Sequence, residues 1–361
     1  MSSKVLFSSV LYERYDADVT LPARFGRMIE HMELADKVRD KVTVIKMHVG
    51  RDIGYTTIHP MFVKILVDKL KSYGVKKVFI GDQTVQDASV RGYREEFLGC
   101  PVVEVCSETG KYYYEHEVDY KTFKNVDIAG CIEDAEFMID LSHVKGHGVC
   151  GYGGACKNIA MGCVTDRTRQ QIHGLEGGLL WDEEKCIHCD QCIKGCNHDA
   201  NSFSEDGKYT VNYHHCTYCQ HCVKVCPTGA ITLTANSYED FQAGMAVCTK
   251  TVLDTFAKDS VYYINFLTNI TALCDCWGLS TPSLVPDIGI MSSSDIVAIE
   301  RACIDAIKLE NLLPSGVPIG MELKDKGHLF ERLHGKSPYI QLDELEKLGL
   351  GTQEYVIEEI K

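Results

Sequence analysis

The chain has 361 residues, 45% of them hydrophobic, which is enough for one large or two ordinary domains with buried cores. Its 37 Lys and Arg face 51 Asp and Glu, and the resulting net charge of −14 disfavours nucleic acid as a partner. No apolar run approaches the ~18 residues of a membrane helix, and the opening MSSKVLFSSV does not read as a secretory signal, so we expect a cytoplasmic protein without a membrane span.

Strands and helices alternate in the first part of the chain. Val42–Val49 is predicted as a strand, Pro60–Tyr73 as an amphipathic helix and Val78–Gly81 as the next strand. A second such passage leads from Phe137–Leu141 through a glycine-rich loop to a helix that begins near Ala155. These βαβ units predict an α/β fold with a parallel or mixed sheet and helices on both faces.

Basic and ionisable side chains follow the ends of these strands, where α/β sheets bind ligands. The glycine-rich loop adds backbone N–H groups, so we predict a site for a small anion or anionic substrate. The motif GYGGACK fits neither a dinucleotide fingerprint nor a P-loop, and plain capping of loops and helices is the alternative. The candidate residues are Lys46, His48, Arg51, His143, Lys145, His147 and Lys157.

Two copies of CxxCxxCxxxC follow, offset by 30 residues at every cysteine. This is the spacing of a bacterial ferredoxin with two [4Fe–4S] clusters, in which the fourth cysteine of each run ligates the other cluster. Cluster 1 is then expected to take Cys186, Cys189, Cys192 and Cys226, and cluster 2 to take Cys216, Cys219, Cys222 and Cys196. Structural zinc fits this spacing poorly, and disulfides are disfavoured in a reducing compartment.

The cysteine runs set the expected domain boundaries. Residues 181–235 are predicted to form an α+β ferredoxin-like insert, with a strand at Leu179–Trp181, a hairpin at Tyr209–Tyr213 and a strand at Ile231–Thr234. The insert would interrupt an α/β domain made of residues 1–180 and 236–361. The elements expected after it are helix Tyr238–Phe256, strands Tyr262–Leu267 and Ile288–Met291, and helix Ile296–Leu309 capped by Ser294 or Asp295.

Ten of the 18 cysteines lie outside the two runs, and most are expected to be buried small hydrophobes. Cys274-Asp275-Cys276 is different, because both thiols face one metal if the chain turns there. Together with Cys163 this pair forms a candidate third metal or cluster site. Inert thiols are the alternative.

Several separated motifs carry a resemblance. They are IKMHVG (Ile45–Gly50), SHVKGHGVCGYGGACKNIAMGC (Ser142–Cys163), CDC (Cys274–Cys276) and PDIGIMSSSDIVAIERA (Pro286–Ala302). In this order they resemble the family called domain of unknown function three-six-two, uncharacterised iron–sulfur-centre proteins. The resemblance implies an α/β domain with an embedded dicluster module, found largely in anaerobes, and it implies no reaction. Residues 295–300, with the sequence DIVAIE, depart from the DPVAID motif that is usual in the family.

These observations predict an iron–sulfur protein whose two [4Fe–4S] clusters exchange low-potential electrons with a redox partner, which would carry a basic docking patch. The alternative is a reductase or reductive activator, an oxidoreductase in which the α/β domain binds a small anionic substrate or an extra cofactor. Purely structural clusters are a third and weaker reading. No SxxK, GxSxG or HExxH motif is present, which disfavours a hydrolase, and no catalytic residue is assigned.

Overall fold

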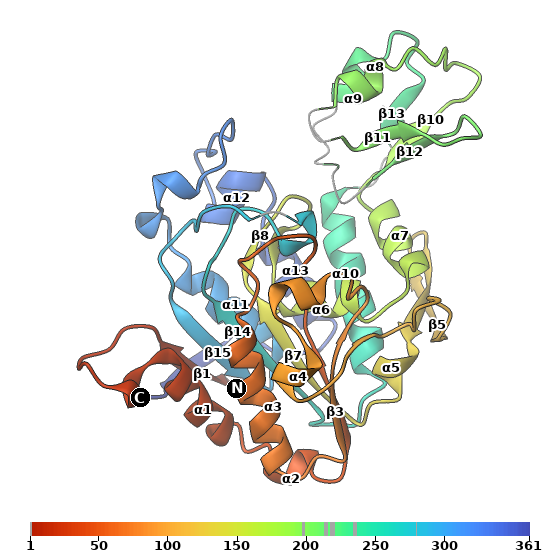
Figure 1. Cartoon of the computed structure of the whole chain (residues 1–361). Helices are drawn as coiled ribbons and strands as arrows, with labels where there is room; N and C mark the ends of the chain where they lie inside the picture. Colours follow the sequence, from red (N-terminus) through yellow and green to blue (C-terminus); the bar gives the residue numbers. More distant parts are fainter. Residues whose placement is uncertain (1, 197–198, 213–215, 217–220, 234–236, 279) are drawn as a thin grey trace.

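The computed structural model of the chain describes residues 2–196, 199–212, 216, 221–233, 237–278 and 280–361 (Figure 1). Within these ranges the largest sheet has eight strands in the order β16, β1, β15, β14, β7, β2, β3, β4. Their bounds are β1 (Ser3–Ser9), β2 (Val42–Lys46), β3 (Lys77–Asp82), β4 (Val102–Glu104), β7 (Phe137–His143), β14 (Val261–Leu267), β15 (Gly289–Ser293) and β16 (Tyr355–Glu359).

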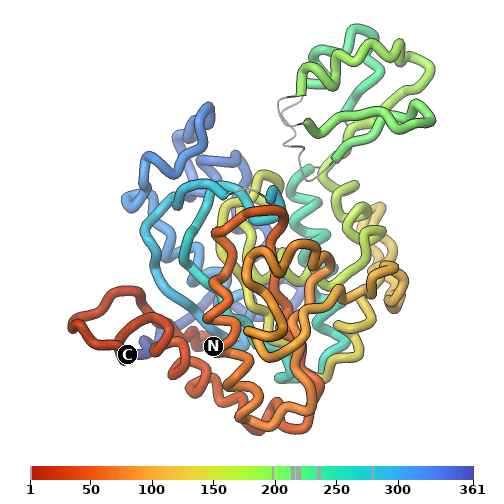
Figure 2. The backbone as a smooth tube through the Cα atoms, in the orientation of Figure 1, coloured from red at the N-terminus to blue at the C-terminus, as the bar shows by residue number. Residues whose placement is uncertain are grey.

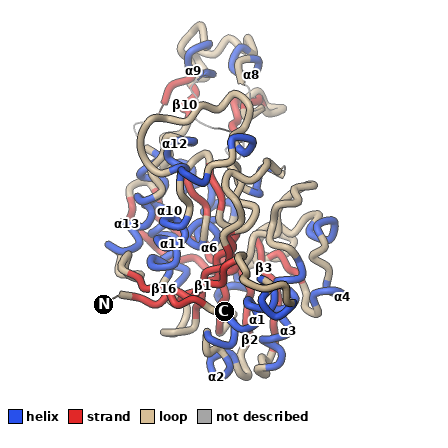
Figure 3. The backbone as a smooth tube through the Cα atoms, turned by 90° about the vertical axis from the view of Figure 1, so that its left-hand side faces the viewer, coloured by secondary structure: helices blue, strands red, loops and turns tan. Residues whose placement is uncertain are grey.

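The sheet is mixed but mostly parallel. Strands β14, β7, β2, β3 and β4 run parallel to one another, whereas β15 is antiparallel to both β14 and β1. The last strand, β16, adds parallel to β1, so the first and last strands of the chain pair at one edge of the sheet (Figure 3). The α/β class predicted from the βαβ pattern is confirmed.

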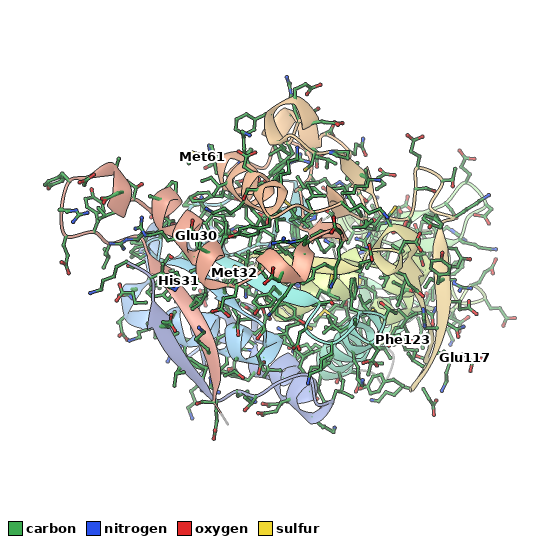
Figure 4. All side chains as sticks on the ribbon, turned by 90° about the horizontal axis from the view of Figure 1, so that it is seen from below. Glu30, His31, Met32, Met61, Glu117 and Phe123 are labelled. Carbon is green, nitrogen blue, oxygen red and sulfur yellow. The ribbon has the colours of Figure 1, made fainter. Side chains whose placement is uncertain are left out.

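Helices cover both faces of the sheet because successive strand residues point to opposite sides. Val44 of β2 belongs to one buried apolar cluster and the adjacent Ile45 to the other. Figure 4, seen from below, places Glu30 and Met61 in the helical layer on one side. Phe123 lies in the β5–β6 hairpin (Tyr113–Tyr120 and Phe123–Ala129) at the edge of the molecule.

The helices of the two layers differ in where they come from in the chain. One apolar cluster takes side chains from α1 (Leu21–His31), α2 (Ala35–Val38), α3 (Pro60–Ser72) and α4 (Glu95–Leu98). The other takes them from α5 (Gly130–Glu133), α6 (Ala155–Gly162), α7 (Asp166–Gly174), α10 (Tyr238–Leu253), α11 (Ile296–Ala306), α12 (Leu329–His334) and α13 (Tyr339–Lys347). In the part of the chain that is described, no helix is apolar over a stretch long enough to cross a membrane.

Element boundaries differ from expectation by a few residues. The strand predicted to reach Val49 ends at Lys46, because the N–H of Val49 donates to the carboxylate of Asp82 at 3.2 Å instead of pairing with a strand. Helix α11 ends at Ala306, since Ile307 already has an extended backbone. Asp295, one of the two predicted caps, does cap this helix.

The segment with the cysteine runs projects beyond the α/β body (Figures 1 and 2). It contains β10 (Leu179–Trp181), α8 (Gln191–Lys194), β11 (Asn201–Phe203), β12 (Tyr209–Val211), α9 (His221–Val225) and β13 (Ile231–Leu233). Strand β10 pairs antiparallel with β13, and β11 with β12. The predicted ends Tyr213 and Thr234 lie outside the described residues.

Replacing Asp295 by Ala should lower the free energy of unfolding by about 2 kcal/mol, because this carboxylate makes several bonds at once. It accepts from the N–H groups of Val297 and Ala298 at 2.9 and 3.0 Å, and from Ser3 and Thr352 at 2.6 and 3.1 Å. Urea unfolding followed by circular dichroism measures the change.

The matched control is Asp68→Ala, which removes only an exposed pair with Lys64 and should change stability by no more than about 0.5 kcal/mol. Equal effects of the two substitutions would contradict the role of Asp295.

Candidate functional site

A cavity opens at the carboxyl ends of β2 and β3, beside the start of α6. Its empty volume is about 760 Å³, part of it open to solvent. The polar and thiol side chains that line it include Lys46, His48, Asp82, His147, Lys157, Asn158, Arg169, His173, Cys216, Cys274 and Cys276. This is the edge at which an α/β sheet is expected to bind a ligand.

A buried ion pair forms one wall of the cavity. The ammonium of Lys46, which is fully buried, lies 3.0 Å from Asp82 Oδ1 and 2.7 Å from Asn158 Oδ1. Asp82 Oδ2 accepts from His48 Nδ1 at 2.8 Å. Burial alone would raise the pKa of Asp82, but the charges of Lys46 and His48 hold it well below its usual range.

The hydrogen bond to Asp82 determines which ring nitrogen of His48 donates a proton to it. Nδ1 carries a proton because it faces a carboxylate, and Nε2 is then the ring nitrogen that faces away from Asp82. Nε2 is buried, and the His48 side chain also shares a hydrogen bond with the side chain of Cys276. Burial lowers the pKa of His48, but the charges of Cys276 and Asp82 outweigh it and raise the pKa to about 9.

Two thiols and an ammonium meet at the cavity wall. Lys157 Nζ lies 3.4 Å from the Sγ of Cys276. A hydrogen bond from the Cys274 thiol, and then the charges of Lys157 and His48, hold the pKa of Cys276 well below its usual value, although burial opposes this. The same hydrogen bond, together with burial, raises the pKa of Cys274. The lowered pKa favours the thiolate form of Cys276, and the raised pKa favours the thiol form of Cys274.

The predicted residues His143 and Lys145 do not line the cavity. His143 Nδ1 and Lys145 Nζ both contact Asp275 Oδ2, at 2.8 and 3.0 Å. They anchor the short 3-10 helix Asp275–Trp277 and so fix the position of Cys276. Arg51 also stays outside: its side chain is 56% exposed and lies 3.9 Å from Asp52. Of the seven predicted residues, the structure brings together Lys46, His48, His147 and Lys157.

The glycine-rich loop binds a carboxylate of the chain itself. The N–H of Ala155 at the start of α6 donates to Glu300 Oε1 at 2.6 Å, and the hydroxyl of Tyr152 donates to the same oxygen at 2.9 Å. A Cβ at Gly154 would overlap both side chains. Burial raises the pKa of Glu300 to about 7. The first N–H groups of this helix are thus committed to Glu300 and are not turned to the cavity.

The predicted cluster ligands are placed in two groups. Cys186, Cys189, Cys192 and Cys226 line one pocket in the projecting segment. Cys192 and Cys222 also belong to its small apolar core, and the N–H of Ala200 donates to Cys196 Sγ at 3.3 Å. Cys216 lines the cavity of Cys276 instead, and Cys219 lies outside the described residues.

Cys163 is not placed with Cys274 and Cys276. Cys163 is buried at the end of α6. Burial raises its pKa, so it stays a thiol; the charge of Lys46 lowers its pKa and the charge of Asp140 raises it. Across the described ranges, no three or more His, Cys, Asp or Glu side chains form a group that could hold a single metal ion, which leaves open the wider spacing that a multi-iron cluster requires.

The sequence analysis identified the basic side chains of this site but missed the buried acidic side chains beside them. Asp82 directly follows the predicted strand Val78–Gly81, and Asp140 interrupts the apolar run Phe137–Leu141, so both positions carried a usable signal. Burial raises the pKa of Asp140 to about 8. The contact between Asp275 and His143 joins residues 132 positions apart, so no local sequence pattern predicts it.

The fold and the site define an α/β protein with a thiol-containing cationic cavity and a separate cysteine-rich segment. The model of the family described as Domain of unknown function (DUF362) matches residues 43–305, and the chain belongs to this family.

Several known proteins are similar to parts of this chain. A pyruvate synthase subunit, PorD of Methanocaldococcus jannaschii, is 37% identical over 53 residues, which are 15% of this chain and 62% of that subunit. The structure of an archaeal membrane-bound sulfane sulfur reductase matches with 37% identity, a TM-score of 0.16, and 16% and 34% of the two chains. The lactate racemase apoprotein of Thermoanaerobacterium thermosaccharolyticum matches at 13% identity with a TM-score of 0.31 over 65% and 45% of the chains. The chain spans less than two thirds of each of these relatives.

Replacing Asp82 by Asn should cost about 3–5 kcal/mol of folding free energy, because it leaves the buried ammonium of Lys46 unpaired. The double variant Lys46→Met/Asp82→Asn should be less destabilised than Asp82→Asn alone. Because the folded pKa of Asp82 is depressed, its contribution is present above pH ~4 and is lost as the pH falls below that value. Urea unfolding at pH 7 and pH 3 tests both statements; additive effects of the two substitutions would contradict the pairing.

Cys276 should react with iodoacetamide at pH 6 to 7, where an ordinary thiol is mostly protonated. Lys157→Met removes the ammonium beside the sulfur and should move the midpoint of the pH profile upward. Peptide mass spectrometry at several pH values measures the reaction. Cys131, whose pKa burial raises, serves as the internal control; a pH profile for Cys276 that matches that of Cys131 would disprove the thiolate.

Proposed function

We propose that the chain is an iron–sulfur electron-transfer protein that carries two [4Fe–4S] clusters. The observation that carries the proposal is the pocket shared by Cys186, Cys189, Cys192 and Cys226. Three of these come from the first cysteine run and the fourth comes from the end of the second, which is the crossed set of a dicluster ferredoxin. When bound, such clusters would supply storage and transfer of single electrons.

The surroundings of these sulfurs suit a cluster. Trp181, Ile187, Phe203 and Ile231 line the same pocket and would shield it from water. Backbone N–H groups of residues 228, 230 and 231 hydrogen-bond to the sulfur of Cys226. Hydrogen bonds to cysteine sulfur stabilise ligating thiolates and tune their potential.

Cluster 2 is proposed for Cys216, Cys222 and Cys196 together with Cys219. The N–H bond from Ala200 to Cys196 is of the same kind as those at Cys226. We also propose that residues 181–235 form the cluster-bearing module, inserted between the parts 1–180 and 236–361 of the α/β domain. The likeness of 53 residues to a pyruvate synthase subunit supports a role beside another redox protein.

The partner we propose is a redox protein with a basic docking patch, because this chain carries a net charge of −14. The described cysteines form no disulfide with one another, which suits a reducing, cytoplasmic compartment, and we propose this compartment as its location.

A reductase is the second candidate, and a specific observation favours it. Cys216, the first cysteine of the second run, lines the same cavity as Lys157 and Cys276. Electrons held at cluster 2 would thus be next to a cationic pocket able to take a small anionic ligand. His147 contributes to this pocket as a neutral ring, because burial and then the charge of Lys157 lower its pKa well below the usual value.

Anaerobically purified protein should contain about eight irons and eight acid-labile sulfides per chain, with spectra of two interacting clusters after reduction. Cys189→Ser and Cys222→Ser should each lose or cripple one cluster, whereas Cys131→Ser, outside both runs, should keep both. Iron and sulfide assays with electron paramagnetic resonance make the measurement. Stoichiometric zinc without sulfide, or full spectra in both ligand variants, would refute the assignment.

A further inference from the structure

We propose that Cys276 and Cys274 are a redox-active pair that reduces the S–S bond of a small anionic disulfide bound in the cavity. The pair shares a hydrogen bond, one ammonium lies 3.4 Å from Cys276, and the cavity reaches the solvent. The proposal rests on the proposed electron-transfer function, because the oxidised pair must be reduced again.

The charges around the cavity favour an anion. Asp82 offsets Lys46, and the Cys276 thiolate offsets the charge of His48. Arg169, which also lines the cavity, is paired with Asp166. The ammonium of Lys157, directly beside the sulfur, is then the positive charge that remains. A carboxylate on the incoming molecule would therefore be attracted to the point where the thiolate stands.

The position of the pair is fixed, as a reacting group requires. His143 and Lys145 hold Asp275 between the two cysteines from one side. Both cysteines line the cavity. In contrast, Cys150 and Cys156 are buried thiols, and burial raises the pKa of each above its usual value.

The reaction balances in two exchanges. The Cys276 thiolate attacks one sulfur of the disulfide R–S–S–R′, forms a Cys276–S–S–R bond and releases R′–S⁻. Cys274 then attacks the Cys276 sulfur, forms the Cys274–Cys276 disulfide and releases R–S⁻, which takes the proton of Cys274. The substrate has gained two electrons and the pair has lost two.

Restoring the thiolate and thiol needs two electrons and one proton. The co-reactant is a low-potential one-electron donor, the class of partner proposed above. Cys216 at the cavity lining puts the electron-carrying segment next to the oxidised pair. The returning proton goes to Cys274, whose raised pKa favours the protonated form.

The first experiment compares two disulfides of similar size under anaerobic conditions. Dithiodiglycolate carries two carboxylates, and 2-hydroxyethyl disulfide carries none. In the cluster-loaded protein dithiodiglycolate should oxidise Cys274 and Cys276 at least about tenfold faster, as a cationic site allows. Lys157→Met should abolish this preference. Rapid acid quench and peptide mass spectrometry locate the new disulfide; equal rates with the two reagents, or first reaction at other cysteines, would overturn the proposal.

Single substitutions distinguish the role of Cys276, which attacks the substrate, from the role of Cys274, which attacks the mixed disulfide. Cys274→Ser should trap R–S on Cys276 as a stable mixed disulfide, and Cys276→Ser should leave Cys274 unmodified. Cys131→Ser should behave as the wild type. If either site variant fails to fold, the time course of the wild-type protein still decides, because the mixed disulfide on Cys276 must precede the Cys274–Cys276 bond.

Iron, sulfide and zinc are measured on the same samples, so the two proposals can fail separately. Intact clusters with no Cys274–Cys276 disulfide would overturn only the present inference. Missing clusters with normal thiol exchange would overturn the electron-transfer function and leave the thiol chemistry standing. A metal ion bound to the pair in the reduced protein would also overturn the redox role.

Discussion

The ion pair between Lys46 and Asp82 joins the parts of the molecule that form the cavity. Lys46 ends β2 and Asp82 ends β3, and the same ammonium reaches Asn158 on α6. The amide of Asn158 in turn donates to Asp140 of β7 at 2.7 Å. Three adjacent parallel strands and one helix are thereby tied together at their polar ends, where backbone pairing alone leaves free groups. The space is tight, since a Cβ on Gly162 would overlap the ammonium of Lys46.

A second set of buried polar contacts, made by Asp275, fixes the position of the two thiols. Asp275 stands between two cysteines, and the two side chains that hold it come from His143, the last residue of β7, and from Lys145, two residues further on. The loop that carries Cys276 is therefore positioned by the central strand of the sheet. At the opposite side of α6, Glu300 takes the first helical N–H and prevents that helix from offering its N-terminus to a ligand. The recognition of an anion must then rest on side-chain charge, chiefly that of Lys157.

Much of this arrangement follows from local sequence. The apolar period of β2, α3 and β3 predicts a βαβ unit, and parallel strands end at one edge, so Lys46 and His48 were expected to meet the glycine-rich segment. Arg51 was expected there as well. It points outward because Gly50, with φ of +79°, turns the chain just before it. The antiparallel strand β15, the return of β16 to β1 and the capture of His143 by Asp275 depend on contacts between distant parts of the chain, which spacing alone does not encode.

The number of buried charges bears on what the α/β domain is for. Lys46, Asp82 and Asp275 are almost fully buried, and Lys145 nearly so. Taking such ions out of water is costly, and well-packed apolar residues often give equal or greater stability. A domain that served only as a docking body for clusters would gain little from this network. A cavity that must keep a thiolate charged and receive an anion needs fixed charges in place before the ligand arrives. The network thus supports the proposal that the α/β domain takes part in chemistry at its cavity, where Cys216 of the cysteine-rich segment also contributes to the lining.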